Sequence, residues 1–335
     1  MNRLFLLLIL SLLYSIRLLY SQEYRINDFT DFENQVNELE KHQQYDEALR
    51  LTKSVIDHFP DREFDILKEI IYINEKTEQY EKNLQIWEKG HAKGYFFLLS
   101  TRLKRYEPYI KFQPFDDLVK QDDSLRIASF EKSKTIWEVI LPDNYSPENQ
   151  YPLLLILHGG GSNLELAKRR WLIIPEFKKN HIITFIQSYR HMDFNTFGWT
   201  SNDERAHRDI KSCFNEIAST FSVDTTRIIL SGISAGGTMC FDVCFKRILP
   251  VWGIIAFCPG MPWTATLESV HNLNTKFFVI GGEQDYYLPK QKELVELFKQ
   301  SGANYIHTII PGMGHEFPDN YQHYMRVGLE FINTD

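Results

Sequence analysis

The sequence predicts an α/β domain built around a mostly parallel sheet, preceded by an all-helical domain. Continuous apolar runs bounded by glycine, proline or polar residues are typical of strands buried on both faces of such a sheet. These runs lie at 151–157, 182–186, 227–230, 277–280 and 306–310. Upstream, the pattern changes to helical spacing and glycine is nearly absent before Gly90. We therefore expect a leader at residues 1–21, a helical domain at 25–132 and an α/β domain at 133–335.

The first 21 residues resemble a secretory leader. Arg3 is followed by the apolar run 4–13, which is too short to span a membrane. Cleavage near Ser21 is expected, although Leu19 stands where a small residue is preferred. The protein is therefore expected to be secreted or periplasmic, with an uncleaved N-terminal membrane anchor as the alternative.

The helical domain contains an internal repeat. Ala48, Leu51 and Val55 fall on one stripe of a helix, and the segment that starts at Gln44-Tyr45 is echoed 35 residues later at Gln79-Tyr80. This spacing resembles the tetratricopeptide repeat, whose period is about 34 residues. The resemblance implies either a groove for a protein partner or a structural brace, and the sequence does not decide between them.

Two repeats of this kind cannot bury their own apolar faces, since about three are normally required. Residues 95–133 are expected to provide further helices. Phe115, Leu118 and Ile127 are the expected buried positions in that segment.

A serine lies in a glycine-flanked turn between a strand and a helix. Ser234 has Gly232 and Gly236 as its second neighbours, after the apolar run 227–230 and before a helical stretch that starts near Thr238. Such a turn is so tight that side chains at the two glycine positions would collide with backbone, and it lifts the hydroxyl above the sheet. The pattern predicts a nucleophile.

A second glycine-rich turn follows an earlier strand. The run 151–157 is followed by His158-Gly159-Gly160-Gly161. Backbone N–H groups in such a turn are able to stabilise the oxyanion that forms during acyl transfer. The alternative is an ordinary flexible turn.

Two titratable residues follow the remaining strands at the same edge of the sheet. Asp285 comes after the run 277–280, and His315 follows 306–310 within Gly312-Met313-Gly314-His315. His315 is predicted to accept the Ser234 proton, and Asp285 to orient the imidazole. Glu283, two residues before Asp285, is the alternative acid.

Through these motifs, the chain from about Lys134 onward resembles the α/β-hydrolases. The order of the three residues along the chain, serine, acid and histidine, is the order found in that family. The chain is most similar to the small esterases, the phospholipases and carboxylesterases, and the polyhydroxyalkanoate depolymerases. The resemblance implies hydrolysis of carboxylic esters through an acyl-enzyme, without a metal or organic cofactor. Ala235 and one of Gly159, Gly160 and Gly161 would supply the oxyanion hole.

The expected substrate pocket is formed by the loop at 187–199, which is rich in aromatic residues. Tyr189, Phe197 and Trp199 are its expected contacts with substrate, and packing of these rings within the loop is the alternative. Only about eighteen residues separate Cys258 from the next strand, so a helical lid of the kind inserted here in larger lipases is not expected.

Charge and cysteine usage are consistent with this interpretation. The formal net charge of −7 gives no reason to expect nucleic acid as a partner. The run Lys168-Arg169-Arg170 is expected to be a solvated helix end, with binding of an acidic substrate as the lesser alternative. The four cysteines show no disulfide or zinc spacing and are expected to be buried thiols: Cys213, Cys240, Cys244 and Cys258.

The partner expected from the sequence is a small-molecule or polymer-borne ester, with a protein partner possible through the helical domain. Two other functions stay open. One is a secreted serine peptidase of the same fold, and the other is a non-catalytic protein that binds through the helical domain.

Overall fold

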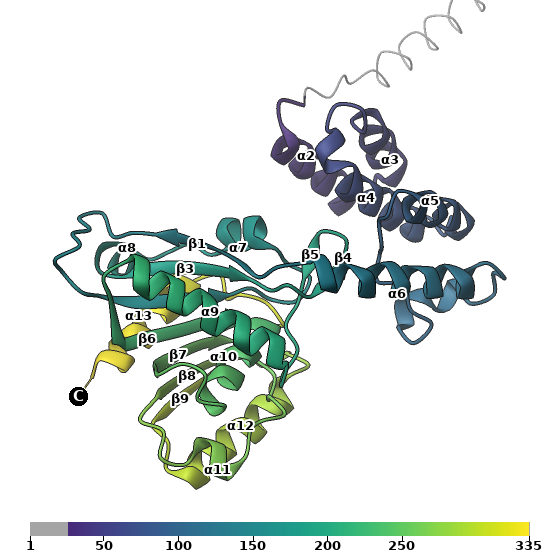
Figure 1. Cartoon of the computed structure of the whole chain (residues 1–335). Helices are drawn as coiled ribbons and strands as arrows, with labels where there is room; N and C mark the ends of the chain where they lie inside the picture. Colours follow the sequence, from purple (N-terminus) through teal and green to yellow (C-terminus); the bar gives the residue numbers. More distant parts are fainter. Residues whose placement is uncertain (1–25, 335) are drawn as a thin grey trace, which may run out of the picture. The chain divides into compact units, whose positions relative to one another are not determined.

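A computed structural model describes residues 26–334 (Figure 1). The chain divides into two compact units. The helical unit comprises the described chain up to Lys93 together with Thr101–Leu118, and the α/β unit comprises Gly94–Ser100 and the chain from Val119 onward. The predicted leader lies outside the described residues. Among residues 26–334, no helix combines the length and apolarity that crossing a membrane requires.

The helical unit contains two helical hairpins that share one backbone design. Its α-helices are α2 (Phe29–Lys41), α3 (Tyr45–Ser54), α4 (Glu63–Lys76) and α5 (Tyr80–Ala92), with short 3₁₀ helices η1 (Pro60–Arg62) and η2 (Lys104–Tyr109). The turns before α3 and α5 each contain one left-handed residue, Gln43 and Glu78, and both have φ of 57°. The hairpins are therefore repeated with the offset of 35 residues seen in the sequence.

The interiors of the two hairpins are filled by different kinds of side chain. The first packs aliphatic and aromatic side chains, among them Phe32, Ala48 and Leu51. At the position equivalent to Ala48, the second hairpin has Asn83, which is fully buried. The Asn83 amide donates to the Ile71 carbonyl at 3.0 Å and to the Tyr109 hydroxyl at 2.7 Å. The polar residue is thus accommodated because the segment after Ser100 supplies a partner.

That segment also covers the apolar side of the second hairpin. The Trp87 ring lies 4.7 Å from the Tyr109 ring and 5.8 Å from the Phe115 ring. Residues 101–118 therefore provide the apolar cover that a third repeat would otherwise give.

Helix α6 (Phe115–Lys132) has Phe115–Leu118 in the helical unit and its remaining residues in the α/β unit. Phe115 and Leu118 are buried as expected, but Ile127 is 58% exposed. Ile127 lies on the opposite side of the helix from buried Asp122, because five residues turn an α-helix by about 140°. The C-terminal part of α6 belongs to the α/β unit, where Arg205 donates to the carbonyls of Phe130 and Ser133 at 2.6 Å each.

A buried carboxylate explains why residues 94–100 belong to the α/β unit. Asp122 accepts hydrogen bonds from the backbone N–H groups of Phe97 at 2.6 Å and Leu99 at 2.9 Å. The carbonyl of Phe96 accepts from the N–H of Phe194 at 3.0 Å. The short segment is thereby attached both to α6 and to the loop that contains Phe194.

The α/β unit contains a seven-stranded sheet with the order β1-β3-β2-β6-β7-β8-β9. Within this sheet β1 pairs with β3 in antiparallel fashion, and the other neighbouring strands are parallel. The strands are β1 (Ile136–Ile140), β2 (Tyr151–Leu157), β3 (Ile182–Gln187), β6 (Val223–Ile233), β7 (Val251–Phe257), β8 (Lys276–Gly282) and β9 (Tyr305–Ile310). A separate small hairpin pairs β4 (His191–Asp193) with β5 (Thr196–Phe197).

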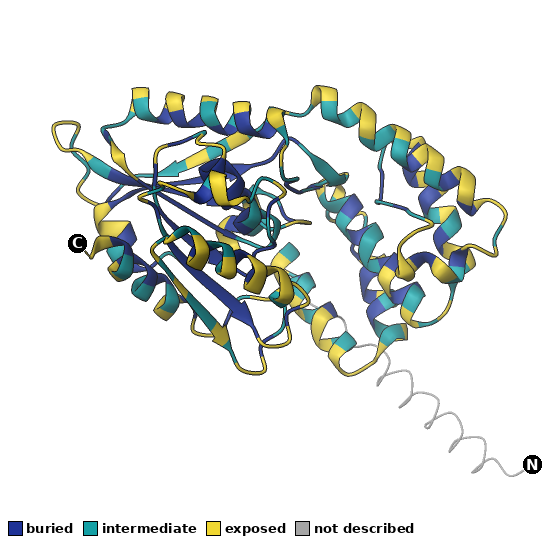
Figure 2. Cartoon of the chain, turned by 90° about the horizontal axis from the view of Figure 1, so that it is seen from below, coloured by how far each residue is buried: buried dark blue, intermediate teal, exposed yellow. Residues whose placement is uncertain are grey.

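Helices cover both faces of this sheet (Figure 1). One face packs against α9 (Glu204–Thr220), α10 (Ala235–Phe245), α11 (Leu267–Val270) and α12 (Leu288–Ser301). The other face packs against α7 (Leu164–Arg170), α8 (Pro175–Asn180) and α13 (Tyr321–Asn333). Successive residues of a strand enter opposite cores: Leu155 joins the first and Ile156 the second. The central strands are accordingly buried along most of their length (Figure 2).

The arrangement confirms the predicted α/β-hydrolase fold preceded by a helical region. The carboxyl ends of β2, β6, β8 and β9 carry the glycine turn, Ser234, Asp285 and His315 respectively. Because these strands are parallel, their carboxyl ends meet at one edge of the sheet. Residues 258–275, where larger lipases insert a lid, contain one four-residue helix, α11.

We predict that Asp122→Ala releases residues 94–100. The substitution leaves two buried N–H groups without their acceptor, so the free energy of unfolding should fall by about 2–4 kcal/mol. Hydrogen exchange of the Phe97 and Leu99 amides should accelerate markedly. Asp123→Ala is the matched control, because the Asp123 side chain is 48% exposed and pairs with Arg126. Equal exchange in the two variants would contradict the assignment.

Candidate active site

Ser234 occupies a strained turn between β6 and α10. Its backbone has φ of 54° and ψ of −121°, a conformation that a residue with a side chain rarely adopts. A Cβ atom on Gly232 would lie 2.5 Å from the Gly236 carbonyl carbon, and one on Gly236 would lie 2.1 Å from the Leu157 carbonyl oxygen. Both positions exclude a side chain, as the sequence predicts, because β2, β6 and α10 approach each other through their backbones here.

The structure brings Ser234, His315 and Asp285 into one hydrogen-bonded line. The Ser234 hydroxyl lies 2.8 Å from His315 Nε2, and His315 Nδ1 lies 2.8 Å from Asp285 Oδ1. The His315 side chain is 17% exposed and that of Asp285 is fully buried. This is the geometry in which a histidine deprotonates a serine while a carboxylate holds the required tautomer.

Asp285, and not Glu283, contacts the histidine. Glu283 is exposed and accepts a hydrogen bond from the N–H of Gly312 at 2.9 Å, so it holds the loop that precedes His315. Both oxygens of Asp285 are fixed by further donors, the Tyr287 N–H at 2.8 Å and the Gln291 side-chain amide at 2.8 Å. Gln291 is fully buried in α12 and has no signal in the sequence that would have identified it.

Glycines also permit the close approach of β8 to the histidine loop. A Cβ atom on Gly282 would lie 2.2 Å from the Met313 carbonyl oxygen, and one on Gly281 would lie 1.8 Å from the Gln291 amide oxygen. The backbone between Gly281 and Asp285 is therefore held tightly against both of its neighbours.

Cys258 lies directly beside the acid and the histidine. Its sulfur, the Asp285 carboxylate and a nitrogen of His315 lie within 4.8 Å of one another. Burial and the charge of Asp285 raise the pKa of the Cys258 thiol to about 12, so the thiol stays protonated. Its sulfur lies 3.4 Å from the Glu316 carbonyl oxygen. The other three cysteines, like Cys258, are free and buried, as the sequence predicts.

The glycine turn after β2 is attached to the β4–β5 hairpin. The Gly161 N–H donates to the Phe197 carbonyl at 3.0 Å, and the Phe197 N–H donates to the Ser162 carbonyl at 2.7 Å. The Met192 sulfur also lies 3.0 Å from the Gly161 nitrogen. Gly161, one of the three expected oxyanion donors, is thus already engaged in holding the turn, because its φ of 70° directs its N–H to the hairpin.

His158 fixes the orientation of the next peptide group. Its Nδ1 lies 2.7 Å from the Gly159 carbonyl oxygen, and its Nε2 accepts the Ser188 N–H at 3.1 Å. Since Nε2 accepts, the proton is on Nδ1 and is donated to Gly159. The carbonyl of Gly159 and the N–H of Gly160 belong to one planar trans peptide and point in opposite directions. The histidine therefore also sets the direction of the Gly160 N–H.

A cavity of about 430 Å³ opens in front of Ser234. It is lined by backbone of the glycine turn, by Ser234 and His315, and by a group of mostly apolar and aromatic side chains with two charged ones. These further lining residues are His158, Ser162, Ala167, Arg170, Trp171, Ile233, Tyr286, Glu316 and Phe317. Arg170, at the C-terminal end of α7, thus faces the cavity, whereas Lys168 pairs with Glu138.

None of the three aromatic residues expected to contact substrate lines this cavity. Tyr189 and Trp199 are 6% and 8% exposed and belong to the core under α9. The Tyr189 hydroxyl donates to Asp203 at 2.7 Å, and the Trp199 ring packs 5.4 Å from the His158 ring. These rings support the turn from behind, which corresponds to the alternative of local packing. The side chains that do face the cavity come from α7 and the residue after it, from the end of β6, and from the segments after β8 and β9.

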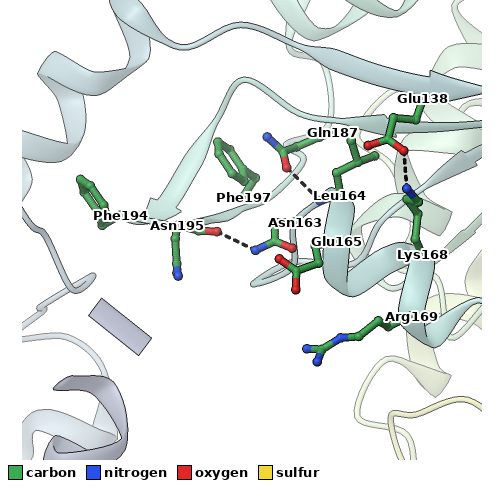
Figure 3. Close-up of a pocket in the computed structure, with 10 residues that line it drawn as sticks. All are labelled: Glu138, Asn163, Leu164, Glu165, Lys168, Arg169, Gln187, Phe194, Asn195 and Phe197. Carbon is green, nitrogen blue, oxygen red and sulfur yellow. Dashed lines mark hydrogen bonds and ion pairs between the residues drawn. The ribbon is translucent and has the colours of Figure 1, made fainter. Parts of the chain in front are cut away.

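Phe197 lines a different hollow beside the hairpin (Figure 3). This second pocket has a volume of about 750 Å³ and contains mainly polar side chains. Two of its contacts are structural: the Gln187 side chain accepts from the Leu164 N–H at 2.8 Å, and Asn163 donates to the Asn195 carbonyl at 3.0 Å. The first contact joins the start of α7 to the end of β3, and the second joins the N-cap of α7 to the hairpin.

A buried acid beneath the rim fixes two further loops. Asp242 of α10 is fully buried and accepts from His207 Nε2 at 2.7 Å, from the Asn202 N–H at 2.7 Å and from the Ser201 hydroxyl at 3.0 Å. It also accepts from the Thr264 hydroxyl. These hydrogen bonds lower the pKa of Asp242 against the effect of burial, so it is ionised. The segments around 201 and 264 are thereby anchored to the helix that follows Ser234.

The fold, the strained serine turn and the hydrogen-bonded Ser–His–Asp arrangement define a serine hydrolase of the α/β-hydrolase class. The chain belongs to the phospholipase/carboxylesterase family, whose family model matches residues 145–334. The protein is therefore a hydrolase of the esterase and phospholipase type. No curated protein sequence matches the chain.

The chain is also similar to solved structures at low sequence identity. An uncharacterized protein from Bacillus cereus ATCC 10987 is 17% identical with a TM-score of 0.50, covering 91% of this chain and 98% of its own. Esterase PE8 is 17% identical with a TM-score of 0.48, covering 59% and 99%. Esterase 2 of Thermogutta terrifontis is 16% identical with a TM-score of 0.47, covering 59% and 88%.

We predict that Gly236→Ala removes the reactivity of Ser234. The added methyl group would meet backbone oxygen at 2.1 Å, which cannot be relieved without moving β2 or α10. The initial rate of labelling by a fluorophosphonate should fall more than about a hundredfold. At Gly237 the nearest atom would be at 3.1 Å, so Gly237→Ala should fold and react within about tenfold of wild type. Wild-type labelling of Gly236→Ala would refute the crowding argument.

We predict that His158 stays neutral at pH 5–8. Burial lowers its pKa to about 4, below the value of about 6.5 for an exposed histidine. The folded state therefore loses stability as the pH falls from about 6.5 towards 4, since unfolding then binds a proton. In NMR spectra of the enzyme with ¹³C-labelled histidine, the His158 signal, assigned with His158→Gln, should not shift between pH 8 and 5. A titration midpoint near 6.5 would contradict this.

Proposed function

We propose that this enzyme cleaves carboxylic esters through an acyl-enzyme on Ser234. The observation that carries the proposal is the pair of 2.8 Å hydrogen bonds joining Ser234 to His315 and His315 to buried Asp285. A cavity of about 430 Å³ with Ser234 in its wall is large enough for a small ester.

In the first half-reaction, the Ser234 oxygen bonds to the ester carbonyl carbon while its proton moves to His315 Nε2. The carbonyl oxygen becomes an oxyanion. The tetrahedral intermediate then collapses, the bond between carbon and alcohol oxygen breaks, and His315 returns the proton to the leaving alcohol. In the second half-reaction, water replaces the alcohol and gives a carboxylic acid and free Ser234.

The N–H groups of Gly160 and Ala235 are the proposed oxyanion donors. Within residues 26–334, neither N–H has a protein acceptor, and Ala235 is the first residue of α10, where intrahelical partners are lacking. A Cβ atom on Gly160 would lie 3.8 Å from the Ala235 Cβ, so the two peptides are neighbours. Gly159 contributes through its carbonyl, which His158 holds.

The partner, by this proposal, is a small or polymer-borne ester. Secretion, proposed from residues 1–21, fits a substrate outside the cell. The two helical hairpins, which resemble tetratricopeptide repeats, are proposed as the part of the protein that a protein partner would contact.

We predict that Ser234→Ala lowers kcat for p-nitrophenyl butyrate by about 10⁴-fold or more while the protein stays folded. Asp285→Asn should lower it by about 10⁴-fold, because the histidine loses its tautomer and orientation. Glu283→Gln is the matched control and should stay within about threefold of wild type, since Glu283 contacts loop backbone instead of His315.

The same assays separate the alternative functions. Undiminished turnover by Ser234→Ala would exclude the acyl-enzyme at this residue. Faster cleavage of aminoacyl-nitroanilides than of esters would favour a peptidase. Absence of fluorophosphonate labelling in wild type would favour a non-catalytic binding role.

A further inference from the structure

A tyrosine ring stands exposed beside the reacting histidine. The Tyr286 side chain is 67% exposed and lines the cavity in front of Ser234. Its ring centroid lies 4.3 Å from that of His315, with the planes tilted by 36°. Exposure of a large aromatic ring to water beside the reacting groups indicates that the ring contacts a ligand.

The backbone beneath this ring is fixed before any substrate arrives. The Asp285 N–H donates to the Gly282 carbonyl at 3.2 Å, and the Tyr287 N–H donates to Asp285 Oδ1 at 2.8 Å. Helix α12 then begins at Leu288. The Tyr286 ring also lies 4.7 Å from the Tyr287 ring, which in turn lies 5.4 Å from the His315 ring, so the three rings form one cluster. The exposed ring is thus held in place, and ordering it costs a bound ligand little entropy.

The position of the ring assigns it to one part of the ester. His315 Nε2 receives the proton from Ser234 and must deliver it to the leaving alcohol oxygen, so the alcohol passes beside the imidazole. Tyr286 packs on that imidazole. The lining contains other apolar side chains, Ala167, Trp171 and Ile233, which come from α7, the residue after it and β6.

We propose that Tyr286 forms a subsite for the alcohol part of the ester and selects alcohols that carry an aromatic ring. This inference rests on the proposed esterase function. The contact is ring stacking, which a flat aromatic group makes and a saturated ring of similar size does not. Tyr286 is a specificity-determining residue in this proposal and takes no part in proton transfer.

The test compares benzyl butyrate with cyclohexylmethyl butyrate, which differ in the alcohol and share the acyl group. Wild type should prefer the benzyl ester in kcat/KM. Tyr286→Leu keeps apolar bulk but removes the ring, and it should lower that preference about three- to tenfold. Tyr286→Phe should retain it. Trp263→Leu is the matched control, because Trp263 is 78% exposed but does not line the cavity, and it should leave the preference unchanged.

Both esters form the same butyryl-enzyme, and this separates binding of the alcohol from support of His315. In the proposal, Tyr286→Leu affects acylation only, so the decay of the butyryl-enzyme stays within about twofold of wild type. If deacylation slows as much as acylation, the ring merely supports the imidazole and the proposal is overturned. An unchanged preference in Tyr286→Leu also overturns it.

The failure of the proposed function would look different. In that case wild type hydrolyses neither ester, or Ser234→Ala hydrolyses both. The subsite proposal is then refuted together with the esterase function. If wild type hydrolyses both esters through Ser234 without a preference that depends on Tyr286, the esterase function stands and only the subsite is refuted.

Discussion

Backbone crowding at the end of β6 is the constraint on which the rest of the site depends. The Gly236 backbone packs so closely on the Leu157 carbonyl that a methyl group would lie 2.1 Å from it. This contact forces Ser234 to φ of 54° and ψ of −121° and directs its hydroxyl away from the sheet. It also places the glycine turn after β2 next to the first residue of α10. Ser234 and the proposed oxyanion donors are therefore positioned by one contact between two backbones, and no flexible side chain intervenes.

Buried polar groups hold the partners of Ser234 at fixed positions. Asp285 receives hydrogen bonds from Tyr287 and Gln291 in addition to His315. Asp242 anchors two rim loops to the helix that follows the nucleophile, and His158 sets the glycine turn. Each of these groups is almost fully buried, and a buried polar group without partners would cost more than these hydrogen bonds return. The hydrogen bonds to Asp285, Asp242 and His158 thus hold the site in place before substrate binds.

Local patterns in the sequence predict the parts of this site that local geometry creates. Glycine at both second neighbours of Ser234 is visible in the sequence because no other residue fits the turn. The order of strand ends likewise predicts that Asp285 and His315 lie near it. These patterns do not predict Trp171 and Gln291, because both reach the site through the packing of α7 and α12 on the sheet. Tyr286 follows Asp285 directly, but no pattern shows that its side chain lines the cavity. The aromatic composition of the loop predicts that Tyr189 and Trp199 contact substrate, but both are buried in the core under α9, behind the cavity.

The segment 94–100 is hydrogen-bonded both to α6 and to the β4–β5 hairpin, which the sequence does not predict. It interrupts the helical unit in sequence, yet Asp122 holds its N–H groups within the α/β unit. Phe96 also accepts from the N–H of Phe194 in the β4–β5 hairpin. Phe197 of that hairpin pairs with Gly161 and Ser162 of the glycine turn. Hydrogen bonds and the backbone of residues 194–197 therefore link the segment 94–100 to Gly161, the residue next to Gly160.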